Sequence, residues 1–262
     1  ITACGMSLVM ITGGIDISVG GVVALVSMCC AVYLDFGGGN PYTAILIALA
    51  IGLGFGLVQG FLVAYLDIQP FIVSLAGMFF ARGMTTIVHT NPFNVENEAF
   101  NKLKMTRVII PGLGSVNKIG KYVDAYVEIG VVVAVLVVIV LFCVLRWTKL
   151  GRAFYAVGGN QQSALMLGIN VKRTKFIAYL ICSLLAGIGG YVYFLHVGSG
   201  SPSHASGMEM NAIASSIIGG TMLTGGVGNI IGTFFGVLSL STIQNIVSSA
   251  GLDQAWWTGI TV

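Results

Sequence analysis

Long apolar stretches separated by short polar segments run along the whole chain, and their lengths predict membrane-spanning helices. A helix needs about 20 apolar residues to cross the hydrocarbon core of a bilayer. The stretches that approach this length cover residues 43–66, 70–88, 128–145, 176–195 and 230–250. Residues 1–12 and 19–34 are predicted as parts of spans beside a break, and 211–223 is too short to cross in a straight line.

Two glycine-rich breaks interrupt this pattern, at residues 12–21 (TGGIDISVGG) and 219–228 (GGTMLTGGVG). Each glycine lowers helix propensity by about 1 kcal/mol relative to alanine. Non-helical backbone is tolerated at membrane depth only inside protein or beside a water-filled cavity, and in transporters such broken helices often border the substrate route. The alternative interpretation is a pair of tight cytoplasmic turns, which need glycine for backbone reasons alone.

Small polar side chains in and beside the breaks are candidates for lining a translocation route. They are Thr12, Asp16, Ser18, Asn211, Ser215, Ser216 and Thr221. Asn211 and Ser215 are four residues apart and share a helix face. The alternative is that these groups hydrogen-bond one helix to another. For Asp16 we favour a cap that accepts backbone N–H bonds at the start of the next helix over a substrate contact.

Arg82 is an ionisable residue inside a predicted span. It lies well into the stretch 70–88, about 18 Å along a helix that rises about 1.5 Å per residue. Charged side chains at this depth pair with one another or with backbone carbonyls. We therefore expect Arg82 to pair with a carbonyl or a carboxylate within the bundle, in a structural role.

The composition predicts an all-α, polytopic transmembrane bundle that forms a single domain over residues 1–262. The chain is 56% hydrophobic and 8% charged, whereas a soluble domain carries about 25% charged residues. Lipid-exposed backbone must satisfy its hydrogen bonds internally, which favours helices. Glycines that recur every four residues predict close helix packing. They form two trios: Gly52, Gly56, Gly60 and Gly228, Gly232, Gly236.

The sequence lacks the motifs and spacings that metal sites and common enzyme activities require. The five cysteines lie in apolar stretches without metal-ligand spacing, and His196 and His204 have no cysteine or carboxylate at such spacing, so no metal site is expected. The chain has no P-loop, no G-x-S-x-G elbow and no H-E-x-x-H motif, so we expect neither ATP hydrolysis nor another enzyme activity. The net charge of +3 comes mostly from one loop and does not indicate nucleic-acid binding.

That loop, residues 147–175, carries the strongest topological signal. Basic residues crowd its two ends: Arg146, Lys149 and Arg152, then Lys172, Arg173 and Lys175. Basic residues in short loops mark the cytoplasmic side, so we predict that 147–175 is cytoplasmic and that the loop 91–125 lies outside. The basic residues of 91–125 weigh against this orientation, although long loops cross the membrane largely regardless of charge.

Four segments, in order along essentially the whole chain, resemble the permease subunit of ribose/galactose-type ABC sugar importers in the branched-chain amino acid/ribose permease family. They are ITGGIDISVGG, PFIVSLAGMFFARG, GRAFYAVGGNQQSALMLGI and NAIASSIIGGTMLTGGVGNIIGTFFGVL. The closest likeness is to galactofuranose-type permeases. The resemblance implies that this sequence lacks an N-terminal segment and a last span, at whose start Trp256 and Trp257 would mark the membrane interface.

What the resemblance implies is a transport machine made of separate parts in a bacterial inner membrane. Two permeases, identical or related, would pair with cytoplasmic ATP-binding subunits that hold ATP and Mg²⁺, while this chain holds no cofactor. A periplasmic binding protein would deliver a monosaccharide of the galactofuranose, ribose or galactose class and largely set the specificity. Residues 151–169 would contain the helix that couples to the ATPase, with Gly158, Gly159 and Asn160 shaping its turn. The coupling residues would be Gly151, Arg152, Gly158, Gly159, Asn160, Ser163, Ala164 and Gly168.

Two other classes of function compete with an importer subunit. A secondary transporter of a small neutral solute would place ionisable residues in mid-membrane for coupling ions, and only Arg82 and Asp16 qualify. A membrane-embedded enzyme would need a catalytic pair or a metal cluster at membrane depth, and the sequence shows neither. A requirement for a separate ATPase would distinguish the importer from both.

Overall fold

The computed structural model describes residues 1–116 and 122–250, and these residues form a helical bundle with two small antiparallel sheets. The first half of the chain comprises α1 (Thr2–Ile11), α2 (Val19–Asp35), α3 (Pro41–Ala64), α4 (Pro70–Val88), β1 (Phe93–Asn94), α5 (Glu98–Lys104) and β2 (Arg107–Val116). The second half comprises β3 (Tyr122–Glu128), α6 (Ile129–Trp147), α7 (Lys149–Gly159), α8 (Gln161–Met166), α9 (Val171–Val197), β4 (Ser199–Gly200), α10 (Met208–Ile218) and α11 (Ile230–Ser249).

Within the described residues, α3, α4, α6, α9 and α11 are long and apolar enough to cross a membrane. They confirm the polytopic all-α class and the five longest predicted spans. Helix α9 begins at Val171, inside the predicted loop 147–175, because the Asn170 side chain caps it by accepting a hydrogen bond from Arg173 N at 3.0 Å. The short helix predicted over 211–223 instead ends at Ile218. Trp256 and Trp257 lie outside the described residues.

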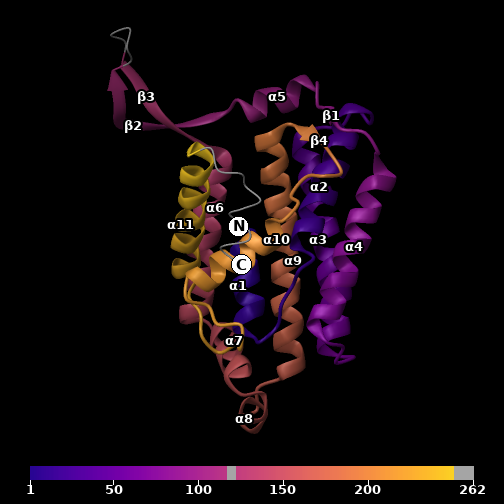
Figure 1. Ribbon diagram of the computed structural model, residues 1–262, viewed down its shortest axis with the longest axis vertical. Helices are drawn as coiled ribbons and strands as arrows, with labels where there is room; N and C mark the ends of the chain where they lie inside the picture. Colours follow the sequence, from indigo (N-terminus) through magenta and orange to yellow (C-terminus); the bar gives the residue numbers. More distant parts are fainter. Residues whose placement is uncertain (117–121, 251–262) are drawn as a thin grey trace.

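The bundle has two distinct ends (Figure 1). Helices α7 and α8 lie at one end, which we name the α8 end. Helix α5 and the sheets lie at the other, the α5 end. The predicted loop 91–125 therefore contains regular structure that the sequence analysis did not predict: α5, β1 paired with β4, and the hairpin of β2 and β3.

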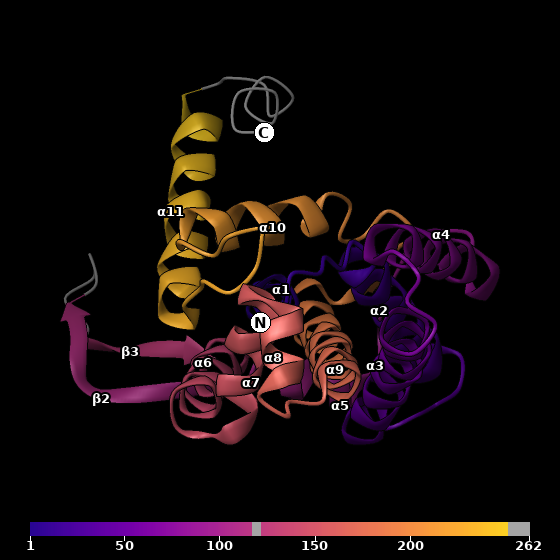
Figure 2. The same ribbon diagram turned by 90° about the horizontal axis from the view of Figure 1, so that it is seen from below.

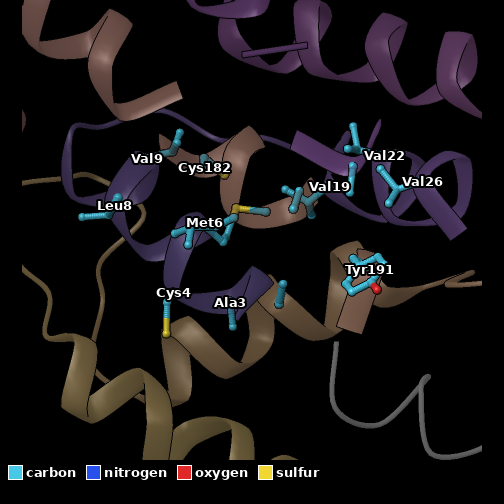
Figure 3. Close-up of a cluster of buried hydrophobic side chains, with 14 of the residues drawn as sticks. Ala3, Cys4, Met6, Leu8, Val9, Val19, Val22, Val26, Cys182 and Tyr191 are labelled. Atoms are coloured by element: carbon cyan, nitrogen blue, oxygen red, sulfur yellow. The ribbon is translucent and has the colours of Figure 1, made fainter. Parts of the chain in front are cut away.

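Helix α9 packs against α1, α2 and α3 at the centre of the bundle (Figure 2). Met6 of α1, Cys182 of α9 and Val19 of α2 meet in its apolar core (Figure 3). Glycine makes the α3–α9 contact possible: a Cβ on Gly52 would lie 2.7 Å from the carbonyl oxygen of Ser183, and one on Gly56 would lie 2.9 Å from Leu180 Cα. The first predicted glycine trio is thus a packing surface.

The second glycine trio holds α10 against α11. A Cβ on Gly232 would overlap the carbonyl oxygen of Gly219, and one on Gly236 would overlap that of Ser215. Gly228 differs from the prediction, because it precedes α11 and packs on Ile11 and Thr221. In Figure 2, α10 runs across the bundle between α11 and α4. This short crosswise helix ends at the second break.

Candidate functional site

Three segments that are distant in sequence meet through glycines near the α8 end. The first break contributes Gly13, the end of α7 contributes Gly158, and the second break contributes Gly225 and Gly226; we name these four residues the glycine junction. Gly226 N donates a hydrogen bond to the carbonyl oxygen of Ile11, at 2.9 Å. A Cβ on Gly158 would overlap that same oxygen and would lie 2.5 Å from Gly226 N. The end of α7 therefore touches the second break and Ile11, the last residue of α1, which leads into the first break.

Backbone conformation explains why this junction is built from glycine. Gly13, Gly225 and Gly226 have φ values of +79°, +86° and +75°. Only glycine adopts this left-handed region without a steric penalty. A Cβ on Gly225 would also lie 2.8 Å from Gly13 N and 2.9 Å from the carbonyl oxygen of Gly158. Conformation and close approach therefore both require glycine here.

Polar bonds fasten α7 to its neighbours. The Tyr155 hydroxyl donates to the carbonyl oxygen of Gly228 in the second break, at 2.8 Å. Burial raises the pKa of that hydroxyl, so it stays protonated and a donor at neutral pH. At the start of α7, the Thr148 side chain caps the helix by accepting from Gly151 N at 3.2 Å. A Cβ on Gly151 would lie 2.5 Å from Leu145 Cα, so α7 begins tightly against α6.

Helix α8 presents an apolar tip at the α8 end. Leu165, Met166 and Leu167 are 59%, 88% and 78% exposed. The turn before this helix is made by Asn160, whose side chain accepts from Ser163 N at 2.9 Å. The turn after it is made by Gly168, at φ +77°. Together these three side chains form an exposed apolar surface at the α8 end.

The predicted coupling residues divide into two groups. Arg152 and Ser163 are exposed. Ala164 is buried, and it packs with Val157 and Val171 to hold α8 against α7 and α9. The prediction that Gly158 and Gly159 shape a turn needs correction, because both are the last residues of α7 and the turn begins at Asn160.

Asp16 and Ser18 form a buried network in the first break. Both are fully buried. Asp16 Oδ1 accepts from Ser18 N at 3.0 Å and from Ser18 Oγ at 2.6 Å. Ser18 Oγ in turn accepts from Gln59 Nε2 of α3, at 2.8 Å. Asp16 therefore braces Ser18, the N-cap residue of α2. It is not itself the helix cap that the sequence analysis preferred, because it accepts a backbone N–H only from Ser18 and no side chain caps α2.

Arg82 pairs with backbone carbonyls, as predicted. Its guanidinium donates to the carbonyl oxygens of His204 at 2.5 Å, Ala205 at 2.9 Å and Pro202 at 3.5 Å. Ala205 has a φ of +53°, a strained value for a residue with a side chain. Arg82 thus holds the loop that leads into α10.

Glu209 is a site residue that the sequence analysis missed. It lies in the first turn of α10, is 9% exposed, and its Oε2 has no hydrogen-bond partner among the described residues. That oxygen lies against Gly20, in the first turn of α2, where a Cβ would overlap it. Negative charge is stabilised at helix N-termini. The Glu209 carboxylate therefore lies where the N-terminal turns of α2 and α10 meet.

The other pathway candidates are mostly occupied in packing. Thr12 Oγ1 donates to the carbonyl oxygen of Val9, and Ser215 Oγ donates to that of Asn211. Ser216 is fully buried and hydrogen-bonds to Ser7 and to the carbonyl oxygen of Ala3. Thr221 is also buried. Asn211 is the one exposed residue among the predicted pathway candidates, so Asn211 and Ser215 do not share an accessible surface.

Within residues 1–116 and 122–250, no three His, Cys, Asp or Glu side chains lie close enough together to hold a metal ion. The cysteines there, Cys4, Cys29, Cys30, Cys143 and Cys182, are all free thiols.

Comparison with known proteins covers nearly the whole chain. A family model described as "Branched-chain amino acid transport system / permease component" matches residues 1–261. The chain is 36% identical over 262 residues to the inner membrane ABC transporter permease protein YjfF of Escherichia coli K12, covering 100% of this chain and 76% of that protein.

Two further relatives carry substrate names. The fructose import permease protein FruG of Bifidobacterium longum is 36% identical over 259 residues, covering 98% of this chain and 74% of that protein. The ribose import permease protein RbsC of Escherichia coli K12 is 36% identical over 254 residues, covering 97% and 75%. No solved structure matches the chain.

Proposed function

The chain belongs to the family of permease components of branched-chain amino acid transport systems, and from this premise we propose that it is the membrane-spanning subunit of an ATP-driven importer for a monosaccharide. It is a multi-pass inner membrane protein and a transport component rather than an enzyme. The family description names amino acids, but the relatives that name a substrate import ribose and fructose. These relatives support a sugar as the cargo.

The observation that carries this proposal is the contact of α7 with the second break and with Ile11 at the glycine junction. Lys149, Arg152, Lys172, Arg173 and Lys175 all lie at the α8 end. By the positive-inside rule, this end faces the cytoplasm, where an ATP-binding subunit can reach it. The exposed tip of α8 suits a groove on such a partner, because apolar anchors contribute much of the binding energy at protein interfaces.

Movement of α8 would then reach the substrate route through rigid contacts. Ala164 ties α8 to α7, and Gly158 ties α7 to the second break and to Ile11, which leads into the first break. Displacement of the α8 tip would therefore move the two breaks, and with them the starts of α2 and α11. Packed contacts of this kind switch between discrete arrangements instead of deforming gradually. ATP and Mg²⁺ would bind to the partner subunit, and this chain would convert the partner's motion into opening and closing.

The remaining partners follow from the same proposal. A periplasmic binding protein would deliver the sugar to the α5 end. A second permease, identical or related, would pair with this one so that the route lies between them. A secondary transporter of a small neutral solute is the competing function, because Asp16 and Glu209 are buried acids beside the breaks. The family of the chain favours the ATP-driven importer.

Cross-linking at Ser163 tests the docking of α8. Ser163 is exposed and next to the apolar tip. In a background without native cysteines, Ser163→Cys is expected to cross-link to the ATP-binding subunit with a short bifunctional reagent, as detected by gel mobility and mass spectrometry. Glu98→Cys, exposed on α5 at the other end, is the matched control and should not cross-link to it. The absence of any Ser163→Cys product with the ATPase would count against docking at α8.

Thiol accessibility tests whether α10 borders the route. We expect Asn211→Cys, at an exposed position, to react with a water-soluble maleimide, and Ser215→Cys, at a 3% exposed position on the same helix, to react at least about tenfold more slowly because it lies against α11. Reaction is measured by mass shift, with and without ATP. If Asn211→Cys stays unreactive in every nucleotide state, α10 does not border the route.

A further inference from the structure

A cavity of about 750 Å³ lies near the α8 end, between α6, α7 and the second break. Phe142 and Leu145 of α6 form an apolar part of its lining, and Arg146 and Arg152 form a basic part. Helix α11 begins in the same lining, at Ile230. Figures 1 and 2 place α6 and α11 at one edge of the bundle. The cavity therefore combines apolar and cationic walls at an edge where two spanning helices end.

Close packing brings the two arginines together without an acidic partner. A Cβ on Gly151 would lie 2.5 Å from Leu145 Cα. The next residues in the chain are Arg152 and Arg146, so this contact places two positive charges side by side, where they repel each other. Neither arginine forms an ion pair with a carboxylate among the residues that the structure describes, and positions 129–208 contain no acidic residue at all.

The position of Arg152 in its helix adds to this unfavourable charge. It lies near the N-terminus of α7, where the helix dipole disfavours a cation, and the first turn of α7 has no acidic residue to offset it. An anion bound between Arg146 and Arg152 would relieve both the repulsion and the unfavourable dipole interaction.

The cavity lies at the level where lipid headgroups meet water. Helix α6 is apolar enough to span the membrane and ends at Trp147, which is 70% exposed. Exposed tryptophans at the ends of spans mark the membrane interface. Ile139 is one turn closer to the bilayer centre than Phe142, on the same face of α6, and is 55% exposed. The cavity therefore suits a molecule with an anionic head at the interface and an apolar chain that lies along α6.

We propose that this cavity binds an anionic phospholipid, with Arg146 and Arg152 holding its phosphate group. A guanidinium suits phosphate because it donates two parallel hydrogen bonds to a pair of oxygens. The N-terminus of α11 adds a partial positive charge to the same cavity. Basic pockets between transmembrane helices are known sites for anionic lipid headgroups.

The two kinds of wall together select this ligand. Free inorganic phosphate would leave Phe142 and Leu145 uncovered. An acidic surface of a cytoplasmic protein would provide no chain to lie along α6. A zwitterionic lipid would bring its own cation close to the two arginines, which disfavours it relative to a lipid whose headgroup is negative overall.

The bound headgroup would lie against a contact next to the glycine junction. Tyr155 and Gly228 both line the cavity, and the Tyr155 hydroxyl donates to the carbonyl oxygen of Gly228 at 2.8 Å. This hydrogen bond joins α7 to the second break. The anionic lipid content of the membrane would thereby influence how firmly α7 holds that break.

Photolabelling in nanodiscs tests the site without reference to transport. A phosphatidylglycerol whose acyl chain carries a diazirine is expected to label α6 near Ile139 and Phe142, as mapped by mass spectrometry. Excess unlabelled phosphatidylglycerol should compete, whereas excess phosphatidylcholine or inorganic phosphate should not. The double variant Arg146→Gln, Arg152→Gln should lower labelling by about 25-fold, because each basic residue near an anionic headgroup contributes about fivefold in binding.

A second pair of cations provides the matched control. The double variant Lys172→Gln, Arg173→Gln removes the same charge from exposed positions at the α8 end that lie outside the cavity, so it should label as the parent does. Equal labelling of the two double variants would overturn the proposal. Competition by inorganic phosphate would overturn it by showing a site for the free anion. Loss of labelling when the ATP-binding subunit is added would overturn it by assigning the two arginines to the docking surface of that partner.

Discussion

Replacing Gly158 with leucine is expected to abolish transport while leaving the protein in the membrane. Even the Cβ of such a side chain would overlap the carbonyl oxygen of Ile11 and would lie 2.5 Å from Gly226 N. Both obstacles are backbone atoms, which cannot rotate away as a flexible side chain does. Overpacking of this kind costs about 1–3 kcal/mol or more, and here the cost falls on the contact of α7 with the second break and Ile11. Sugar uptake into proteoliposomes should fall to background, with ATP hydrolysis by the partner no longer stimulated by substrate.

Gly159 provides the control for this experiment. It is the next residue of α7, and a Cβ there meets no described atom within 4 Å. We expect Gly159→Ala to transport normally, whereas Gly158→Ala should already be strongly impaired. Equal uptake by these two alanine variants would show that the glycine junction does not transmit motion.

Replacing Gly20 with leucine is expected to have the second largest effect. Gly20 lies in the first turn of α2, and a Cβ there would overlap Glu209 Oε2 and lie 3.1 Å from the carbonyl oxygen of Ala205. A leucine must therefore push α10, and the loop that Arg82 holds, away from α2. We expect loss of uptake together with a thermal unfolding temperature several degrees lower. A clash that lowers the free energy of unfolding by about 1–3 kcal/mol lowers the unfolding temperature of a protein of this size by several degrees.

Two variants separate the contact at Gly20 from a general effect of leucine in a helix. Gly83→Leu adds the same side chain to α4 in open space and should leave the unfolding temperature nearly unchanged. Gly20→Ala should be less stable than the parent, and the added change Glu209→Ala, which removes the overlapping oxygen, should recover part of the loss. If Gly20→Leu is as stable and active as Gly83→Leu, α2 and α10 are not in close contact.

The spans could be predicted from the sequence because each depends on local composition. The run over 128–145 has no polar side chain after Glu128, and it corresponds closely to α6. The pairing of Arg82 with carbonyl oxygens could also be predicted, because a charged side chain at that depth pairs either with another charge or with backbone carbonyls. Loop boundaries were less accurate: capping by Asn170 extends α9 into the segment that looked like loop.

The glycine junction could not be predicted, because it depends on three segments that are distant in sequence. The motif YAVGGN suggests a turn, and only the packing of α7 shows that Gly158 contacts Ile11 and Gly226. Glu209 and Gln59 gave no signal either. Each is a single polar residue whose importance comes from its contact with a distant segment: Glu209 lies against Gly20, and Gln59 donates a hydrogen bond to Ser18. The pathway candidates were chosen by chemistry alone, and burial shows that most of them serve the packing of this structure.

Dependence of uptake on the ATP-binding subunit distinguishes an ATP-driven importer from a secondary transporter. The measurement is uptake of radiolabelled ribose, fructose and galactose, each supplied with its binding protein, into proteoliposomes that contain the permease and are loaded with ATP. We expect uptake of at least one sugar only when the ATP-binding subunit and ATP are both present, and none from an ion gradient alone. Uptake driven by a proton or sodium gradient without the ATP-binding subunit would contradict this expectation and would identify the protein as a secondary transporter.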